Sequence, residues 1–203
     1  MNTIRLTLLA LCLLLCACGN QALRAVRYLP QEGDVAFQSL PHEPLVDAIE
    51  GCTESPFSHC GILHRAGGQW VVIEAIGPVK ETPFAAWVAQ ARDARYSVFR
   101  LRAGYRAKIP AFIAAAQSYA GRPYDIHYDM DDAAIYCSEL IFKAFRKAAG
   151  EDLGKLQTLG QLKWERHALV IKYLEGGKLP LNRMMITPRS LSEAVQLERV
   201  YAL

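Results

Sequence analysis

Two short strand-like runs joined by a glycine-rich turn place an antiparallel hairpin in the first half of the chain. The runs cover residues 60–64 and 70–76, and the segment Arg65-Ala66-Gly67-Gly68-Gln69 between them is typical of a turn. A turn that enters a strand is also expected at 33–37, and a further strand at 96–102. The hairpin and these strands predict a sheet that is at least partly antiparallel.

Helical segments accompany these strands without alternating regularly with them. The predicted helices cover residues 45–50, 83–92, 109–119 and 136–149, and a further one opens at Thr187-Pro188. The order of the elements predicts an α+β domain, with an antiparallel sheet packed against helices, rather than a doubly wound parallel sheet. At 203 residues, the chain is long enough for one full hydrophobic core and short for two.

The first eighteen residues have the layout of a secretory signal. A positive Arg5 precedes an apolar run that is too short to cross a bilayer, and the run ends in Leu15-Cys16-Ala17-Cys18. This ending resembles the bacterial lipoprotein signal, which implies lipidation of Cys18; Gly19 after it implies delivery to the outer membrane, facing the periplasm. The expected division is 1–18 signal peptide, 19–31 tether and 32–203 domain. A plain signal peptide cut nearby, or an uncleaved anchor, are the alternatives.

The net charge and the cysteines bear on the partners and on the disulfide state of the protein. The net charge is only +3 and no basic block stands out, so nucleic acid is not an expected partner. Three of the six cysteines lie within the first eighteen residues, which leaves Cys52, Cys60 and Cys137 in the domain. Either Cys52 and Cys60 form a disulfide and Cys137 is free, or the thiols are simply buried.

Cys137 begins the apolar stripe of the helix predicted at 136–149. The stripe consists of residues at helical spacing, namely Cys137, Leu140, Ile141, Ala144, Phe145 and Ala148. At a helix N-terminus the free backbone N–H groups and the helix dipole favour a thiolate, and they can also stabilise an oxyanion. The position alone does not distinguish a nucleophile from a core cysteine.

The hairpin brings a histidine and a carboxylate together. If residues 65–68 form a four-residue loop, His64 pairs with Gln69 and His59 lies directly opposite Glu74. Glu74 shares its strand face with apolar residues and therefore needs a partner, for which His59 is the obvious candidate. The alternatives are an exposed edge strand, or a hairpin that is slipped by one residue.

The motifs around these three residues resemble a known family. They are Ser58-His59-Cys60-Gly61-Ile62, Glu74 and Tyr136-Cys137-Ser138-Glu139-Leu140-Ile141, accompanied by Gly33-Asp34-Val35, Gly121-Arg122-Pro123-Tyr124-Asp125 and Ile186-Thr187-Pro188. In this order they resemble the circularly permuted branch of the NlpC/P60 papain-like cysteine hydrolases, in particular its YiiX/YebB-like subfamily. The resemblance implies a permuted papain-like fold in which Cys137 is the nucleophile, His59 the base and Glu74 the third member of a triad.

Two further expectations concern the substrate site and cofactors. Tyr124 is expected to shape the substrate site, whereas the side chain that completes the oxyanion hole is not identified. No metal or other cofactor is expected, because His59 and His64 face opposite sides of their strand and no C-x-x-C pair occurs.

Three functions remain open for the site. The first is a cell-wall peptide amidase or endopeptidase. The second is an acyl hydrolase or acyltransferase that acts on lipids, as lecithin:retinol acyltransferase does. The third is a non-catalytic envelope lipoprotein that binds a ligand, against which the intact Cys, His and Glu argue.

Overall fold

A computed structural model describes residues 28–202. The chain divides into two compact units, 1–30 and 31–203, and the following description concerns the second. The predicted signal peptide, the lipidation site Cys18 and most of the tether lie outside the described residues. Within those residues, no helix combines the length and the apolar character that a membrane crossing requires.

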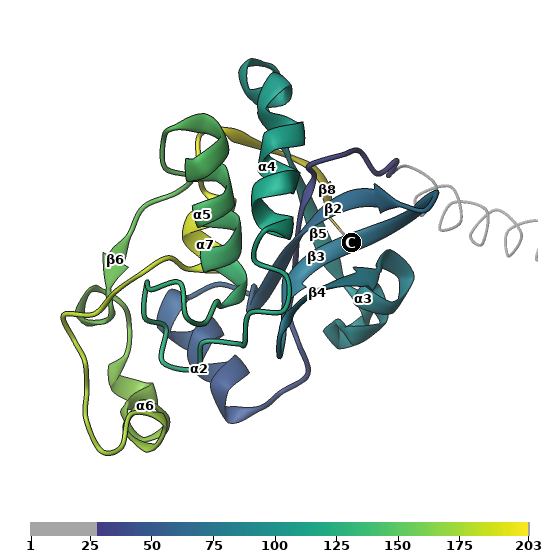
Figure 1. Ribbon diagram of the computed structural model, residues 1–203. Helices are drawn as coiled ribbons and strands as arrows, with labels where there is room; N and C mark the ends of the chain where they lie inside the picture. Colours follow the sequence, from purple (N-terminus) through teal and green to yellow (C-terminus); the bar gives the residue numbers. More distant parts are fainter. Residues whose placement is uncertain (1–27, 203) are drawn as a thin grey trace, which may run out of the picture. The chain divides into compact units, whose positions relative to one another are not determined.

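The strands form a six-stranded, entirely antiparallel sheet with the order β4-β3-β2-β1-β5-β8 (Figure 1). These strands are β1 (Val35–Gln38), β2 (His59–Ala66), β3 (Gln69–Ala75), β4 (Val79–Pro83), β5 (Tyr96–Leu101) and β8 (Leu197–Ala202). A separate two-stranded sheet pairs β6 (Gln157–Thr158) with β7 (Met184–Met185). The sequence analysis missed the two edge strands, β4 and β8, because polar and charged side chains occupy much of both.

The helices are α2 (Pro44–Thr53), α3 (Phe84–Gln90), α4 (Ile109–Gln117), α5 (Cys137–Ala149), α6 (Ala168–Leu174) and α7 (Pro188–Ser192). Helices α4 and α5 pack against each other on one side of the sheet, and α3 lies beside β3 and β4 on the other (Figure 1). The predicted α+β class is therefore confirmed.

Helix α5 is positioned by its apolar stripe. Leu140, Ile141, Ala144 and Phe145 are fully buried, in one core cluster with side chains of β1, β2 and β3. Burial of a large apolar side chain contributes about 1.5–3 kcal/mol, so this stripe fixes the helix on the sheet. Tyr136 caps its start together with the Glu139 carboxylate, and the helix ends at Gly150, whose φ is +80°.

The register of the β2–β3 hairpin differs from the predicted one by two residues. Ala66 pairs with Gln69, so the loop contains only Gly67 and Gly68, whose φ angles are +55° and +84°. Two successive residues with positive φ are what a tight two-residue hairpin turn requires, and glycine adopts them without strain. A shift of two residues leaves every side chain on its predicted face.

As a result, Gly61 rather than His59 lies directly opposite Glu74. The strands approach so closely here that a Cβ at position 61 would lie 2.3 Å from Val72 Cγ1. His59, two residues before Gly61, lies diagonally across from Glu74 on the same face of the sheet. Because Gly61 has no side chain, nothing separates the side chains of His59 and Glu74.

Candidate active site

Cys137 is the first residue of α5 and is only 3% exposed. Its Sγ lies 4.0 Å from the carbonyl oxygen of Ser58, the residue directly before β2. The first turn of α5 therefore reaches the start of β2, where His59 begins the strand. The fold brings together two residues that are 78 positions apart in the printed sequence (137 − 59 = 78).

His59 and Glu74 form a buried pair across the β2–β3 hairpin. His59 Nε2 and Glu74 Oε2 are 2.6 Å apart, and the side chains are 3% and 0% exposed. Thr82 of β4 donates its hydroxyl to the other oxygen, Glu74 Oε1, at 2.5 Å. Both carboxylate oxygens therefore have partners. Thr82 holds the carboxylate in place, and the carboxylate in turn fixes the orientation of the His59 ring.

The His59 ring also makes a hydrogen bond with the Cys137 sulfur. Because Nε2 is engaged by Glu74, the ring nitrogen available for the sulfur is Nδ1. Burial lowers the pKa of His59, but the hydrogen bonds to Cys137 and Glu74 outweigh it and raise this pKa to about 9. For Glu74, burial is likewise outweighed by the hydrogen bond from His59, which lowers the pKa of the carboxyl below 4.5.

Cys60 is a site residue that the sequence analysis did not assign. Its thiol makes a hydrogen bond with the Cys137 sulfur, and this contact, together with the one from His59, outweighs burial and holds the pKa of Cys137 well below 9. Burial followed by the neighbouring Cys137 raises the pKa of Cys60 itself well above 9. The arrangement favours a Cys137 thiolate that accepts from two donors.

The question of the disulfide is settled within the described residues. Cys52, Cys60 and Cys137 are all buried and free, so no bond joins Cys52 to Cys60. Burial and the nearby Glu165 raise the pKa of Cys52 to about 11.

Tyr124 lies close to this site. Its hydroxyl is 3.1 Å from the hydroxyl of Tyr128, whose ring packs on that of Tyr136, directly before the nucleophile candidate. Burial, together with Tyr128 and Cys137, raises the pKa of Tyr124 well above 10, so its hydroxyl is neutral. Tyr124 and His59 line the same hollow, and the role of Tyr124 in shaping the substrate site stays a prediction.

Two hollows meet at the catalytic candidates. The first opens to solvent and has a cavity volume of about 90 Å³, and Cys137 and Ser138 form part of its wall. The second has His59, Tyr124 and Gln90 in its wall. Ser58 borders both hollows, so a substrate bound across this residue would span the sulfur and the imidazole.

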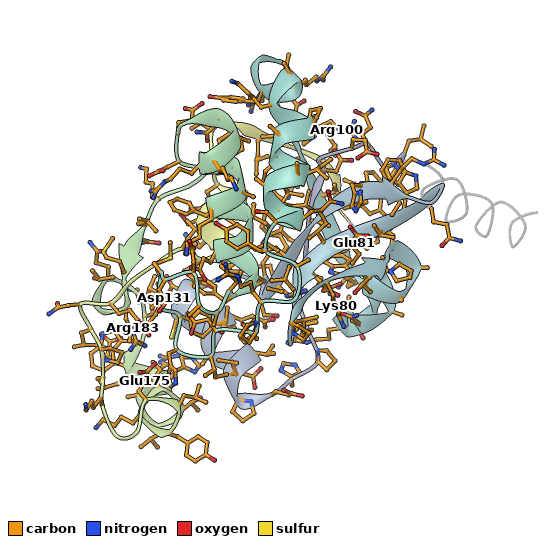
Figure 2. The ribbon with its side chains drawn as sticks, in the orientation of Figure 1. Lys80, Glu81, Arg100, Asp131, Glu175 and Arg183 are labelled. Carbon is orange, nitrogen blue, oxygen red and sulfur yellow. The ribbon has the colours of Figure 1, made fainter. Side chains whose placement is uncertain are left out.

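A paired ionic cluster forms the rim of the first hollow. Arg183 and Glu175 lie together beside α6 (Figure 2), and the guanidinium of Arg183 donates to the Glu175 carboxylate and to the backbone oxygen of His127. It also forms an ion pair with Asp129 at 2.9 Å. One guanidinium is thus shared by two carboxylates.

The order of the three residues along the chain identifies the class of site. A thiol at a helix N-terminus next to an imidazole–carboxylate pair is the arrangement of nucleophilic thiol catalysis. Here His59 comes first, Glu74 second and Cys137 last. The fold and the site together define a permuted papain-like hydrolase.

The chain belongs to the family described as "Permuted papain-like amidase enzyme, YaeF/YiiX, C92 family", whose model matches residues 29–201. The predicted YiiX-like family is therefore confirmed, and papain-like amide hydrolysis is the chemistry associated with this family.

Two relatives from Escherichia coli resemble the chain over most of its length. The uncharacterized protein YiiX of strain K12 is 32% identical over 179 residues, which are 87% of this chain and 88% of YiiX. The crystal structure of YiiX from strain O157:H7, described as a metalloprotein, matches with a TM-score of 0.82 and 31% identity, over 87% of this chain and 99% of that one.

The residues that the structure describes do not fit a metal centre of the kind that the word metalloprotein suggests. Among residues 28–202, no three His, Cys, Asp or Glu side chains gather as a ligand set. The Nε2 atom of His59 is hydrogen-bonded to Glu74, and the Nε2 atom of His64 is hydrogen-bonded to Glu81.

Proposed function

We propose that this protein is a thiol amidase in which Cys137 is the nucleophile, His59 the acid and base, and Glu74 the residue that orients the imidazole. The observation that carries the proposal is the His59 ring, which contacts the Cys137 sulfur on one side and the Glu74 carboxylate on the other. A binding protein has no need for a buried thiolate held between an imidazole and a second thiol.

The reaction follows from these contacts. The Cys137 thiolate attacks the amide carbonyl, the C–N bond breaks, and the proton on His59 Nδ1 passes to the leaving amine. A water molecule then gives a proton to His59 and attacks the thioester, which releases a carboxylic acid and restores the thiolate. The backbone N–H groups of the first turn of α5 are placed to stabilise the oxyanion in both steps.

The finer proposal concerns the substrate, for which cell-wall peptides remain the first candidate and acyl groups on lipids the second. Both classes contain a carbonyl that a thiolate attacks. Incubation of the purified full-length protein with muropeptides and with acyl lipids, read by mass spectrometry, tests the proposal. Products are expected from the wild type and not from a Cys137→Ala variant; equal product from both would contradict an enzymatic role for this thiol.

We further propose that the protein is a lipoprotein anchored through Cys18 to the outer membrane, facing the periplasm. The support is the sequence Leu15-Cys16-Ala17-Cys18-Gly19. A Cys18→Ser variant is expected to lose the covalent lipid, which metabolic labelling with palmitate measures. Retention of the label in that variant would rule out Cys18 as the anchor.

A further inference from the structure

We infer that Cys60 is a resolving thiol for Cys137: a hydroperoxide oxidises the Cys137 sulfur to a sulfenic acid, and Cys60 converts this acid into a disulfide that reversibly inactivates the site. Such an oxidation needs a reactive Cys137 but no amide substrate, so it goes beyond the proposed hydrolysis. Three features of the site support it: the contact between the two thiols, the difference in their ionisation, and the access of small molecules to Cys137.

The two sulfur atoms are held next to each other by helix α5 and strand β2. Cys137 is the first residue of α5 and Cys60 the second residue of β2, and both belong to the same buried core cluster. The Cys60 thiol and the Cys60 backbone N–H both donate to the Cys137 sulfur. An S–S bond is about 2.05 Å long, so the sulfurs must move together to form it, but no other side chain separates them.

The two thiols differ in the way that a peroxide-reactive pair requires. Hydrogen bonds from Cys60 and His59 hold the pKa of Cys137 well below 9, whereas burial, followed by the neighbouring Cys137, raises the pKa of Cys60 well above 9. Only a thiolate attacks a peroxide, so Cys137 is oxidised first. Once its sulfur carries a neutral hydroxyl group, the negative charge that helps to keep Cys60 protonated is gone.

Small oxidants reach Cys137 through the first hollow, whose wall is mainly apolar. Cys137 forms part of this wall, and the cavity volume of about 90 Å³ exceeds the ~30 Å³ that one molecule occupies in liquid water. Hydrogen peroxide contains only one oxygen atom more than water and therefore fits. Cys60 is fully buried, which makes it a partner for the oxidised Cys137 rather than the first target of the oxidant.

Two steps account for all atoms and electrons. In the first, the Cys137 thiolate attacks one peroxide oxygen and the O–O bond breaks. The sulfur loses two electrons and becomes a sulfenic acid, and the released hydroxide takes the proton of the His59 imidazolium to form water. In the second, the Cys60 sulfur attacks the Cys137 sulfur, the S–O bond breaks, and the departing hydroxide takes the Cys60 proton to form another water.

The disulfide stops hydrolysis but preserves the nucleophile. A sulfur bonded to Cys60 does not attack a carbonyl, and a thiol reductant regenerates both cysteines. Without a neighbouring thiol, a sulfenic acid is oxidised further to a sulfinic acid, which thiol reductants do not restore. Cys60 therefore matters most in an oxidising compartment, such as the periplasm proposed above.

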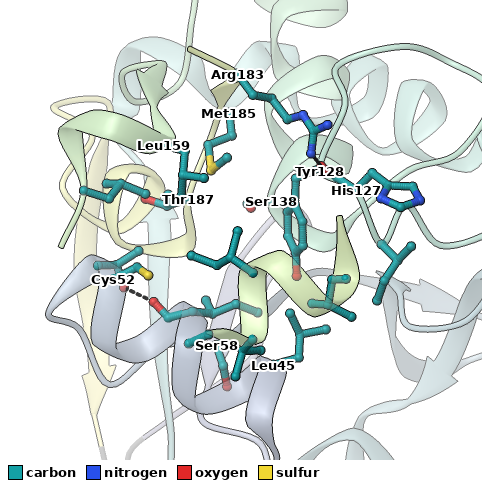
Figure 3. Close-up of a pocket in the computed structure, with 18 of the residues that line it drawn as sticks. Leu45, Cys52, Ser58, His127, Tyr128, Ser138, Leu159, Arg183, Met185 and Thr187 are labelled. Atoms are coloured by element: carbon teal, nitrogen blue, oxygen red, sulfur yellow. Dashed lines mark hydrogen bonds between the residues drawn. The ribbon is translucent and has the colours of Figure 1, made fainter. Parts of the chain in front are cut away.

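Cys52 provides an internal control. It lies near the end of α2, in the wall of the same hollow, where Figure 3 shows it together with Ser58 and Ser138. Its pKa is raised to about 11 by burial and by Glu165, not by another thiol. Cys52 thus shares the hollow with Cys137 but lacks the ionisation that reaction with a peroxide requires.

Peptide mass spectrometry tests the resolving role. The reduced full-length protein is treated with a small excess of hydrogen peroxide and digested without reductant. A pair of peptides linked through Cys60 and Cys137 is expected from the wild type and from a Cys52→Ser variant. Absence of this pair from the wild type, or a pair that contains Cys52 instead of Cys60, would overturn the inference.

Recovery of the thiol measures the protection. After peroxide and then dithiothreitol, the fraction of Cys137 that iodoacetamide alkylates is compared with that of the same protein before treatment. Recovery is expected to be nearly complete in the wild type and Cys52→Ser, and at least about tenfold lower in Cys60→Ser, in which Cys137 accumulates as the sulfinic acid. Cys60→Ser keeps a hydrogen-bond donor at this position, so the comparison concerns the second sulfur.

Equal recovery in all three proteins would exclude Cys60 as the resolving thiol, and the linked peptides of the wild type remain decisive should Cys60→Ser not fold. Neither measurement needs a substrate, so the outcomes are distinguishable from those of the proposed function. A linked Cys60–Cys137 pair in a protein that cleaves no amide would support the inference while the amidase proposal fails. Amide cleavage that depends on Cys137 but persists in peroxide without the linked pair would overturn the inference alone.

Discussion

Replacing Cys137 with serine is expected to reduce amide hydrolysis by at least about a thousandfold, because a hydroxyl does not ionise where the thiol does. The pKa of Cys137 lies well below 9 and that of His59 is raised to about 9. The lowered pKa of the thiol and the raised pKa of the imidazole together favour a thiolate–imidazolium pair, in which the nucleophile is already ionised. A serine at this position would have to be deprotonated during the reaction itself.

The ion pair gives the activity a defined pH dependence. As the pH rises through about 9, His59 loses the proton that it must give to the leaving amine, so kcat/KM is expected to fall. As the pH falls through the lowered pKa of Cys137, the thiolate is protonated and the rate falls again. A bell-shaped profile with its basic limb near pH 9 is expected from initial rates.

Alkylation by iodoacetamide, followed by peptide mass spectrometry, measures the thiolate without a substrate. Cys137 is expected to react at neutral pH, whereas Cys52, whose pKa is raised to about 11, is not. A His59→Ala variant should move the reaction of Cys137 to higher pH. Equal labelling of the three domain cysteines in the wild type would contradict the ion pair and favour a non-catalytic role.

Helix α5 and the histidine–carboxylate pair could be predicted from the sequence because each depends on local patterns. The apolar stripe and Gly150 gave the extent of the helix and thus the place of Cys137 at its start. The pairing of His59 with Glu74 was predicted with the wrong register. The contact between His59 and Glu74 is nevertheless present, because an error of two residues does not change the face on which a strand side chain lies.

The residues and segments that complete the site from distant or polar parts of the sequence could not be predicted from it. The Thr82 hydroxyl, which binds the Glu74 carboxylate, comes from β4. This edge strand contains charged residues and therefore gives no alternating apolar pattern. The contact of Cys60 with Cys137 depends on how α5 packs against β2, which no local pattern encodes. The apolar hollow needs α6, in which Leu169 and Tyr173 are exposed although they are apolar, so the amphipathic pattern of this helix is weak.

Glu74→Gln is expected to reduce kcat by about a hundredfold to ten-thousandfold, as the loss of the orienting carboxylate does in other triads. The neutral amide removes the charge that stabilises the His59 imidazolium, and it can present an N–H group to Nε2 in place of an acceptor. The ring would then lose its fixed orientation toward Cys137. Initial rates at saturating substrate measure the change.

The same variant is expected to lower the free energy of unfolding by about 3 kcal/mol, because it leaves a buried partner without its counter-charge. The pKa of Glu74 is lowered below 4.5 in the folded state, so its contribution to stability is present above the unfolded pKa and is lost as the pH falls through the folded pKa. The pKa of His59 is raised from 6.5 to about 9, so its contribution is complete below about pH 6.5 and is lost as the pH rises through 9. Urea unfolding of both proteins at several pH values should therefore give the largest difference between about pH 4.5 and 6.5.

A second histidine–glutamate pair in the same sheet provides the matched control. Glu81 of β4 binds His64 of β2 at 2.9 Å, but Glu81 is 38% exposed and the pair has no contact with Cys137 among those described. Glu81→Gln is expected to cost less stability, since solvent screens the exposed carboxylate, and to leave kcat unchanged. A loss of activity in Glu81→Gln as large as in Glu74→Gln would mean that the effect comes from the stability of the sheet, and the special role of Glu74 in orienting His59 would have to be abandoned.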